Sequence, residues 1–234
     1  MRVLVAVLSV MLLPLNGVAQ QDAVKVEKKP APRPLVSGFI VMPTYTYHDY
    51  SEQYHAQFVM HAIGIRGGYT TELTPLYNFT LNASGTITGL LQNVANTDVR
   101  FFGINARFGY RVPSIREPWN LSLGFGGYYS TMSVSSGLFG YQHLIGPQIY
   151  PALRYKIDRD HAFATFAKFS PVSGKGVKLL SLENREIAVG MILSRQLEGG
   201  GNLSLTTTLT ELQLSIKGIL VESTSFSLGL GYGW

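Results

Sequence analysis

Apolar and polar residues alternate one by one along most of the chain beyond residue 34. The final run is typical, because its apolar side chains are separated by single serines and glycines. No apolar stretch of about 18 residues and no 3.6-residue helical period interrupts the pattern in this part of the chain. A period of two predicts β-strands with one apolar face. Counted back from the C-terminus, the pattern predicts ten strands, at 35–47, 55–69, 73–84, 98–112, 119–131, 143–157, 161–170, 185–197, 202–215 and 219–234.

The face opposite the apolar one carries mainly glycine, serine, threonine and alanine. A soluble barrel or sandwich turns its apolar face inward and covers its outside with charged residues. Here the small polar face suits a crowded barrel interior, and the apolar face then meets lipid. The pattern therefore predicts an all-β fold, an antiparallel transmembrane β-barrel of about ten strands, in preference to a soluble barrel. Eight and twelve strands stay as alternatives, because 85–97 could pair and 161–170 is weakly patterned.

The first nineteen residues have the pattern of a secretory signal peptide. An apolar run over 3–15 follows Arg2 and precedes a small residue, Ala19. A membrane anchor is the alternative, but a spanning helix needs about 20 apolar residues and Pro14 interrupts this run. We expect cleavage after Ala19. The expected domains are then a signal peptide at 1–19, a disordered periplasmic tail at 20–34 and a barrel at 35–234.

The last strand resembles the C-terminal assembly signal of Gram-negative outer-membrane β-barrel proteins. The family signature is a terminal aromatic residue preceded by alternating apolar residues, matched here by Phe226, Leu228, Leu230, Tyr232 and Trp234. The resemblance implies export and insertion by the barrel assembly machinery into the outer membrane, among its lipid and lipopolysaccharide. It identifies no subfamily. An even strand number would put both termini in the periplasm, with a short turn at 70–72 and outer loops at 48–54, 85–97, 132–142 and 171–184.

Composition narrows the chemistry. The chain has 234 residues, 14% charged residues, a formal net charge of +5 and no cysteine, which excludes disulfides and a lipid-bearing cysteine. The run Asp158-Arg159-Asp160-His161 lies in a predicted periplasmic turn, whereas an omptin-type protease needs its acidic pair on the outer rim. No His-x-Ser of the lipid A deacylase type occurs, and segment 48–55 lacks a recognised metal spacing. We expect a monomer with no catalytic residue, metal, cofactor or nucleic-acid partner.

The inward phase of the strands assigns six basic residues to the lumen. Five lie toward the periplasmic end and Lys168 lies higher; the five are Arg66, Arg107, Arg111, Arg154 and Lys156. A buried unpaired cation is costly, so each must meet water, a carboxylate or an anion. The predicted partners are Glu72, Glu117, Asp158 and Asp160, and the alternative is a narrow wet pore that favours anions. Four inward aromatic residues would close a narrow barrel: Phe58, Tyr128, Tyr150 and Phe166.

Three functions follow from the sequence, in order. The first is a structural or surface-interaction role, and the second is a narrow anion-leaning pore for small solutes. The third is a lipid-modifying enzyme, which adjoining serine and histidine residues in a membrane-facing groove would support. The tail at 20–34, with four basic and two acidic residues, is a candidate tether to an anionic periplasmic partner.

Overall fold

The computed structural model describes residues 37–53, 56–92, 97–115, 117–135, 139–175, 177 and 183–234. The expected signal peptide, its cleavage site at Ala19 and the tail at 20–34 lie outside these residues. In the described part of the chain, no helix is long and apolar enough to cross a membrane.

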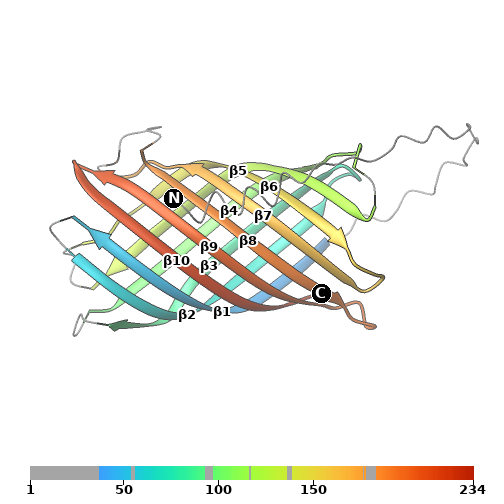
Figure 1. Cartoon of the computed structure of the whole chain (residues 1–234), viewed down its shortest axis with the longest axis horizontal. Coiled ribbons are helices and arrows are strands. Elements are labelled where there is room, and N and C mark those ends of the chain that lie inside the picture. Colours follow the sequence, from blue (N-terminus) through green and yellow to red (C-terminus); the bar gives the residue numbers. More distant parts are fainter. Residues whose placement is uncertain are drawn as a thin grey trace, which may run out of the picture. The chain divides into compact units, whose positions relative to one another are not determined.

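Ten strands make up the described structure (Figure 1). They are β1 (Ser37–Glu52), β2 (Ala56–Glu72), β3 (Tyr77–Gln92), β4 (Val99–Arg111), β5 (Trp119–Val134), β6 (Leu144–Lys156), β7 (His161–Pro171), β8 (Arg185–Gln196), β9 (Asn202–Ile216) and β10 (Ile219–Gly233). The predicted strand number is therefore confirmed, and the alternatives of eight and twelve strands are wrong.

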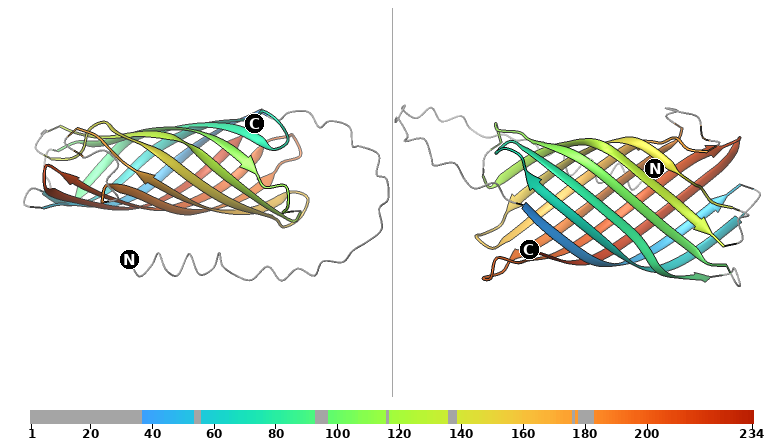
Figure 2. Two further views of the ribbon diagram at one scale, coloured as in Figure 1. Left: turned by 90° about the horizontal axis from the view of Figure 1, so that it is seen from above. Right: turned by 180° about the vertical axis from the view of Figure 1, so that it is seen from behind.

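The strands form one antiparallel sheet that closes into a barrel, because β1 pairs with β10 as well as with β2. The strands are strongly tilted in the barrel wall in all three views (Figures 1 and 2). Phe39 and Trp234 exchange two backbone hydrogen bonds of 3.0 Å where the described chain begins and ends. We call this end of the barrel the terminal end and the opposite end the distal end. That the terminal end faces the periplasm stays a prediction.

An apolar band surrounds the outside of the barrel. Along β10 it runs from Phe226 to Trp234, with every second side chain exposed. This depth matches the about 9–11 tilted residues that a strand needs to cross the hydrocarbon of a bilayer. Aromatic pairs border the band at the terminal end, with ring centroids 4.7 Å apart for Phe39–Tyr69, 5.4 Å for Tyr77–Tyr110 and 4.6 Å for Trp119–Tyr155. Such girdles mark the level of lipid headgroups.

The two faces of the wall exchange character near the distal end. On β9 the inward side chains change from threonine to Leu212 and Leu214, while the outward ones change from leucine to Glu211 and Gln213. The same change occurs across the paired strands: the row Tyr47–Phe226–Leu209 is apolar, and the next outward row is Asp49–Thr224–Glu211. An apolar interior under a polar exterior is the pattern of a water-exposed β-structure. This part of the wall therefore projects beyond the hydrocarbon band.

The exchange explains why the predicted boundaries were wrong at the distal end. β1 continues to Glu52 and β3 to Gln92, so most of the predicted loops at 48–54 and 85–97 is strand. β5 likewise continues to Val134, into the predicted loop at 132–142. At the terminal end, 70–72 closes β2 instead of forming a turn. Where the apolar side chains change from the outward to the inward positions of a strand, the two-residue alternation is interrupted. A prediction that assigns one face of each strand as apolar throughout then ends the strand at that point.

Candidate functional site

The terminal half of the lumen holds two arginine side chains from different strands. Arg66 on β2 and Arg107 on β4 both point inward, and they lie close enough for their charges to interact. The Arg107 guanidinium carbon lies 3.9 Å from the centre of the Tyr150 ring on β6. Gly124 on the intervening strand leaves room for this contact, because a Cβ atom there would lie 3.3 Å from Cδ of Arg107 and would press slightly against it. Phe166 stacks on the other side of the site, 5.0 Å from Tyr150 between ring centroids.

The remaining basic residues of the terminal half lie nearer the mouth. Arg111 forms an ion pair of 3.5 Å with Glu72, and Lys156 forms one of 3.7 Å with Glu117. Arg154 is exposed. Asp158 was predicted to pair with a basic residue of the lumen, and this is wrong. Its carboxylate lies 3.0 Å from Nδ1 of His161 in its own turn. The same carboxylate accepts hydrogen bonds from the backbone N–H groups of Asp160 and His161, which lowers the pKa of Asp158.

Lys168 stands apart from the other cations because it has a close acidic partner in the middle of the lumen. Its Nζ lies 2.5 Å from Oε1 of Glu186, with both side chains largely buried, and 3.9 Å from the centre of the Tyr128 ring. The prediction did not name this carboxylate as a lumen residue. The inward phase shared by Glu186, Ala188 and Gly190 could have revealed it.

The distal half of the lumen is filled by an apolar cluster, which we call the distal plug. Its buried members come from seven strands and the adjoining segments: Tyr50, Phe58, Met60, Ala62, Val99, Tyr128, Met132, Tyr141, Leu144, Val172, Val177, Leu212, Leu214 and Val221. Two of the four predicted closing aromatics, Phe58 and Tyr128, belong to it. The other two, Tyr150 and Phe166, lie nearer the terminal end, where Tyr150 contacts Arg107. Side chains from opposite walls thus meet across the lumen.

A serine and a histidine meet in the lumen through closure of the barrel. Oγ of Ser223 on β10 lies 3.1 Å from Nε2 of His48 on β1, and both residues are buried. The His48 ring also packs against Phe101, 4.4 Å away between centroids. No carboxylate of the described residues is hydrogen-bonded to His48. This sealed pair does not lie in a membrane-facing groove, so it lacks the setting that would support a lipid-modifying enzyme.

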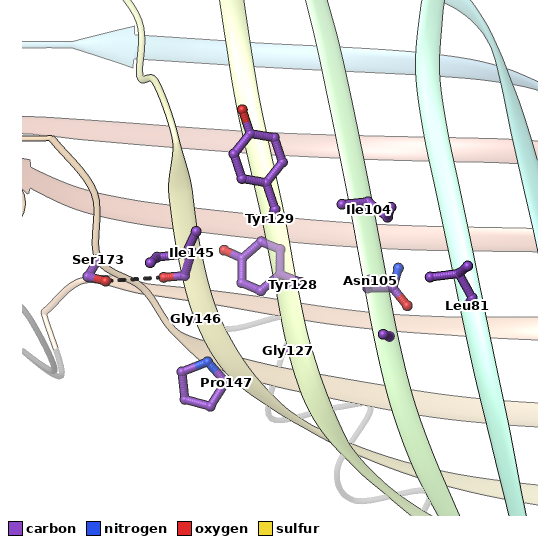
Figure 3. A pocket seen from close by; sticks show the side chains of 11 residues that line it. Leu81, Ile104, Asn105, Gly127, Tyr128, Tyr129, Ile145, Gly146, Pro147 and Ser173 are labelled. Atoms are coloured by element: carbon purple, nitrogen blue, oxygen red, sulfur yellow. Dashed lines mark hydrogen bonds between the residues drawn. The ribbon is translucent and has the colours of Figure 1, made fainter.

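An apolar groove of about 540 Å³ does lie on the outward face, between β3 and β6 (Figure 3). Small residues, Ala106 and Gly127, form its floor between the larger side chains of Leu81, Ile104 and Ile145. Ser173 lines the groove, but its hydroxyl donates to the carbonyl oxygen of Ile145 at 3.3 Å. The groove is a lipid-facing depression with one serine and no lining histidine.

The wall beside this groove is weakly hydrogen-bonded because of three prolines. The β6–β7 register sets Pro147 opposite Pro171, and Pro151 also points its nitrogen toward β7. Proline has no N–H to donate, so both bonds of the Pro147–Pro171 pair are lost. The hydroxyl of Ser170 replaces one of them by donating to the Pro147 carbonyl oxygen at 2.5 Å.

The predicted assembly-signal residues line the outward face of β10, next to β1. The side chains of Phe226, Leu228, Leu230, Tyr232 and Trp234 are all exposed. The Trp234 ring stacks on Phe39, at 6.2 Å between centroids, and on Tyr232, at 6.0 Å. These residues thus form part of the seam that closes the barrel, and their role in assembly stays a prediction.

Outer-membrane β-barrels of known structure are similar to this chain. The outer membrane protease OmpT from Escherichia coli has a TM-score of 0.57 at 11% identity, with 85% of this chain and 96% of that chain covered. The COG4313 outer membrane channel from Pseudomonas putida F1 has a TM-score of 0.45 at 11% identity, covering 89% of this chain and 99% of that one. Ail from Yersinia pestis has a TM-score of 0.40 at 12% identity, covering 85% and 98%. No family model and no curated protein matches the sequence.

Identities this low show the fold alone. The only Asp-x-Asp of the sequence, Asp158 to Asp160, lies in a turn at the terminal end. Among the described residues, no three acidic or histidine side chains gather as a metal site would require. The closed barrel agrees with the fold of the OmpT structure, and the apolar band and aromatic girdle are those of a barrel that spans a membrane. The protein is therefore a ten-stranded bacterial outer-membrane β-barrel.

Proposed function

We propose that this protein is a closed outer-membrane barrel with a structural or surface-interaction role, and that it is neither a pore nor an enzyme. The distal plug carries the first part of the proposal. A pore needs a continuous water path, whereas the plug side chains meet across the lumen and are excluded from solvent. The buried Lys168–Glu186 pair lies next to the plug residue Tyr128 and helps to fill the lumen.

The projecting part of the wall supports a role at the surface. Its outward side chains include three carboxylates on adjacent strands, Asp49, Glu211 and Glu222, and all three are exposed. Apolar packing inside keeps this polar exterior rigid, because the plug fills the same level of the barrel. The result is a stable polar surface outside the hydrocarbon, which a partner at the cell surface can reach.

Conductance measurement tests the closure. Purified protein in planar lipid bilayers is expected to show no stepwise current, because the lumen is blocked. Removing plug volume with the double variant Phe58→Ala and Met60→Ala should produce small openings. Steady conductance of the unaltered protein would contradict the closed lumen and favour the anion-leaning pore, especially if the current were carried by anions.

Cysteine labelling in intact cells tests the surface role. Because the chain has no cysteine, single substitutions report one position each. Glu222→Cys should react with a membrane-impermeant maleimide on whole cells, whereas Leu228→Cys on the same strand should be protected by lipid. If Glu222→Cys reacts only after the cells are broken, the projecting part faces the periplasm and the surface role is wrong.

A further inference from the structure

Among the described residues, no carboxylate pairs with Arg66, although this arginine points into the barrel. Its side chain points into the lumen and is partly buried, so some of its surface still reaches solvent. In the described part of the chain, the ion pairs of arginine and lysine involve Arg100, Arg111, Lys156 and Lys168. Arg107 is also left without a carboxylate and contacts the Tyr150 ring instead.

Two neighbouring guanidinium groups in this position repel each other, and Arg66 has lost part of its hydration by burial. Burying an unpaired cation is costly, and a second cation nearby adds to the cost. The cost is offset only if something negative or strongly polar occupies the space between them. Removing the arginines would be the simpler solution for a purely structural barrel.

The side chains around the pair are suited to holding an anion. Arginine offers planar, bidentate donors that match phosphate, sulfate and carboxylate oxygens. Stacking on Tyr150 orients the Arg107 plane, and the Arg107 side chain reaches this ring by passing over Gly124 on the inner face of β5. Exposed Arg154 near the mouth of the terminal end adds positive charge along the route from water.

We propose that Arg66, Arg107 and Tyr150 form a binding site for a small soluble oxyanion, such as inorganic phosphate, that enters from the terminal end. The distal plug closes the lumen on the other side, so the site is a blind pocket that binds an anion and does not pass it on. The site faces the lumen and not the lipid, so a lipid headgroup does not reach it. The inference goes beyond the proposed function and does not depend on the surface role.

Titration calorimetry with sodium phosphate, on the folded barrel in detergent at pH 7 and constant ionic strength, tests the site. We expect Arg66→Met and Arg107→Met each to weaken phosphate binding at least tenfold. Arg100→Met is the matched control, because Arg100 lies on β4 like Arg107 but is exposed on the outside and paired with Asp98 at 2.8 Å. Its phosphate affinity should equal that of the unaltered protein.

A conservative change guards against loss of folding in the methionine variants. Arg107→Lys keeps the charge but loses the planar stacking on Tyr150, so its phosphate affinity should fall between those of the unaltered protein and Arg107→Met. Sulfate should compete with phosphate, and chloride at the same ionic strength should compete far less. The proposal is overturned if the unaltered protein binds no phosphate, if chloride competes as well as sulfate, or if all variants bind equally.

Discussion

The buried ion pair between Lys168 and Glu186 makes a quantitative prediction about stability. Glu186→Gln keeps the shape of the side chain and removes its charge. It thereby leaves the Lys168 ammonium without a counter-charge, 2.5 Å from a neutral oxygen or nitrogen and against the Tyr128 ring. Breaking a buried pair from one side costs about 3–5 kcal/mol. At the 2.5 Å of this pair, an effective dielectric constant near 20 gives about 7 kcal/mol of attraction, which is an upper bound because both charges also lose hydration on burial.

The double variant Lys168→Met with Glu186→Leu separates the charge effect from packing. Replacing both charges by apolar groups removes the desolvation cost, so the double variant should be close to the unaltered protein or more stable. The control is Asp98→Asn, which breaks the Arg100–Asp98 pair, where the two side chains are 63% and 49% exposed. This change should cost less than about 1 kcal/mol.

Reversible urea unfolding in lysophospholipid micelles measures all three variants. The two tryptophans, Trp119 and Trp234, are exposed on the apolar band, so their fluorescence reports removal of the barrel from lipid. The reasoning is refuted if Glu186→Gln costs less than about 1 kcal/mol, or if the double variant is as unstable as this single variant. Either result would mean that the Lys168 charge is hydrated or is not held by Glu186.

Three further predictions concern the barrel seam, one strand pair and one turn. Deleting Trp234 removes the aromatic end of the closing strand, so insertion should drop several-fold while export is unchanged, as measured by heat-modifiable mobility of membrane fractions; unchanged insertion would count against an assembly role. Gly190→Ala brings a Cβ atom to 2.5 Å from a backbone oxygen of β9 and should cost about 1–3 kcal/mol in urea unfolding. Gly199→Ala, where no atom lies within 4 Å, should cost far less, and equal costs would refute the packing argument. The pKa of Asp158 is lowered by hydrogen bonding in the folded protein. The carboxylate therefore stabilises the turn at any pH above the ordinary pKa of an aspartate, and this stabilisation is lost as the pH falls through the lowered pKa of the folded state. Protection of the His161 amide, measured as its exchange rate relative to that of an unstructured peptide at the same pH, should therefore fall only in acid, and in an Asp158→Ala variant it should already be low at neutral pH; equal protection in both proteins at pH 7 would contradict this.

The local pattern was sufficient for the fold because it is repeated in every strand. A period of two assigns the two faces of each strand, and the small residues of one face with the apolar residues of the other indicate which face meets lipid. The inward position of Arg107 and Lys168 followed from this phase, as did the exposed apolar side chains of β10. Each of these inferences depends only on residues close together in the sequence.

Side-chain contacts between strands were not predicted from the pattern within each strand. The Lys168–Glu186 pair depends on the register of β7 with β8, and the His48–Ser223 contact depends on closure of β1 against β10. The position of Arg107 over Tyr150 also depends on the strand between them, where Gly124 leaves room for the arginine side chain. Register and closure are set by the whole sheet, so one strand's sequence does not determine them.

The sequence by itself determined ten strands, a lipid-facing exterior and a basic terminal half of the lumen. Only the tertiary structure decided that the strands continue past the hydrocarbon, where Leu212 and Leu214 turn inward and Glu211 turns outward. The physical reason is that the same alternation serves two environments. In lipid the apolar face must point out, and in water it must point in, so the position of the membrane boundary emerges only when neighbouring strands are placed side by side.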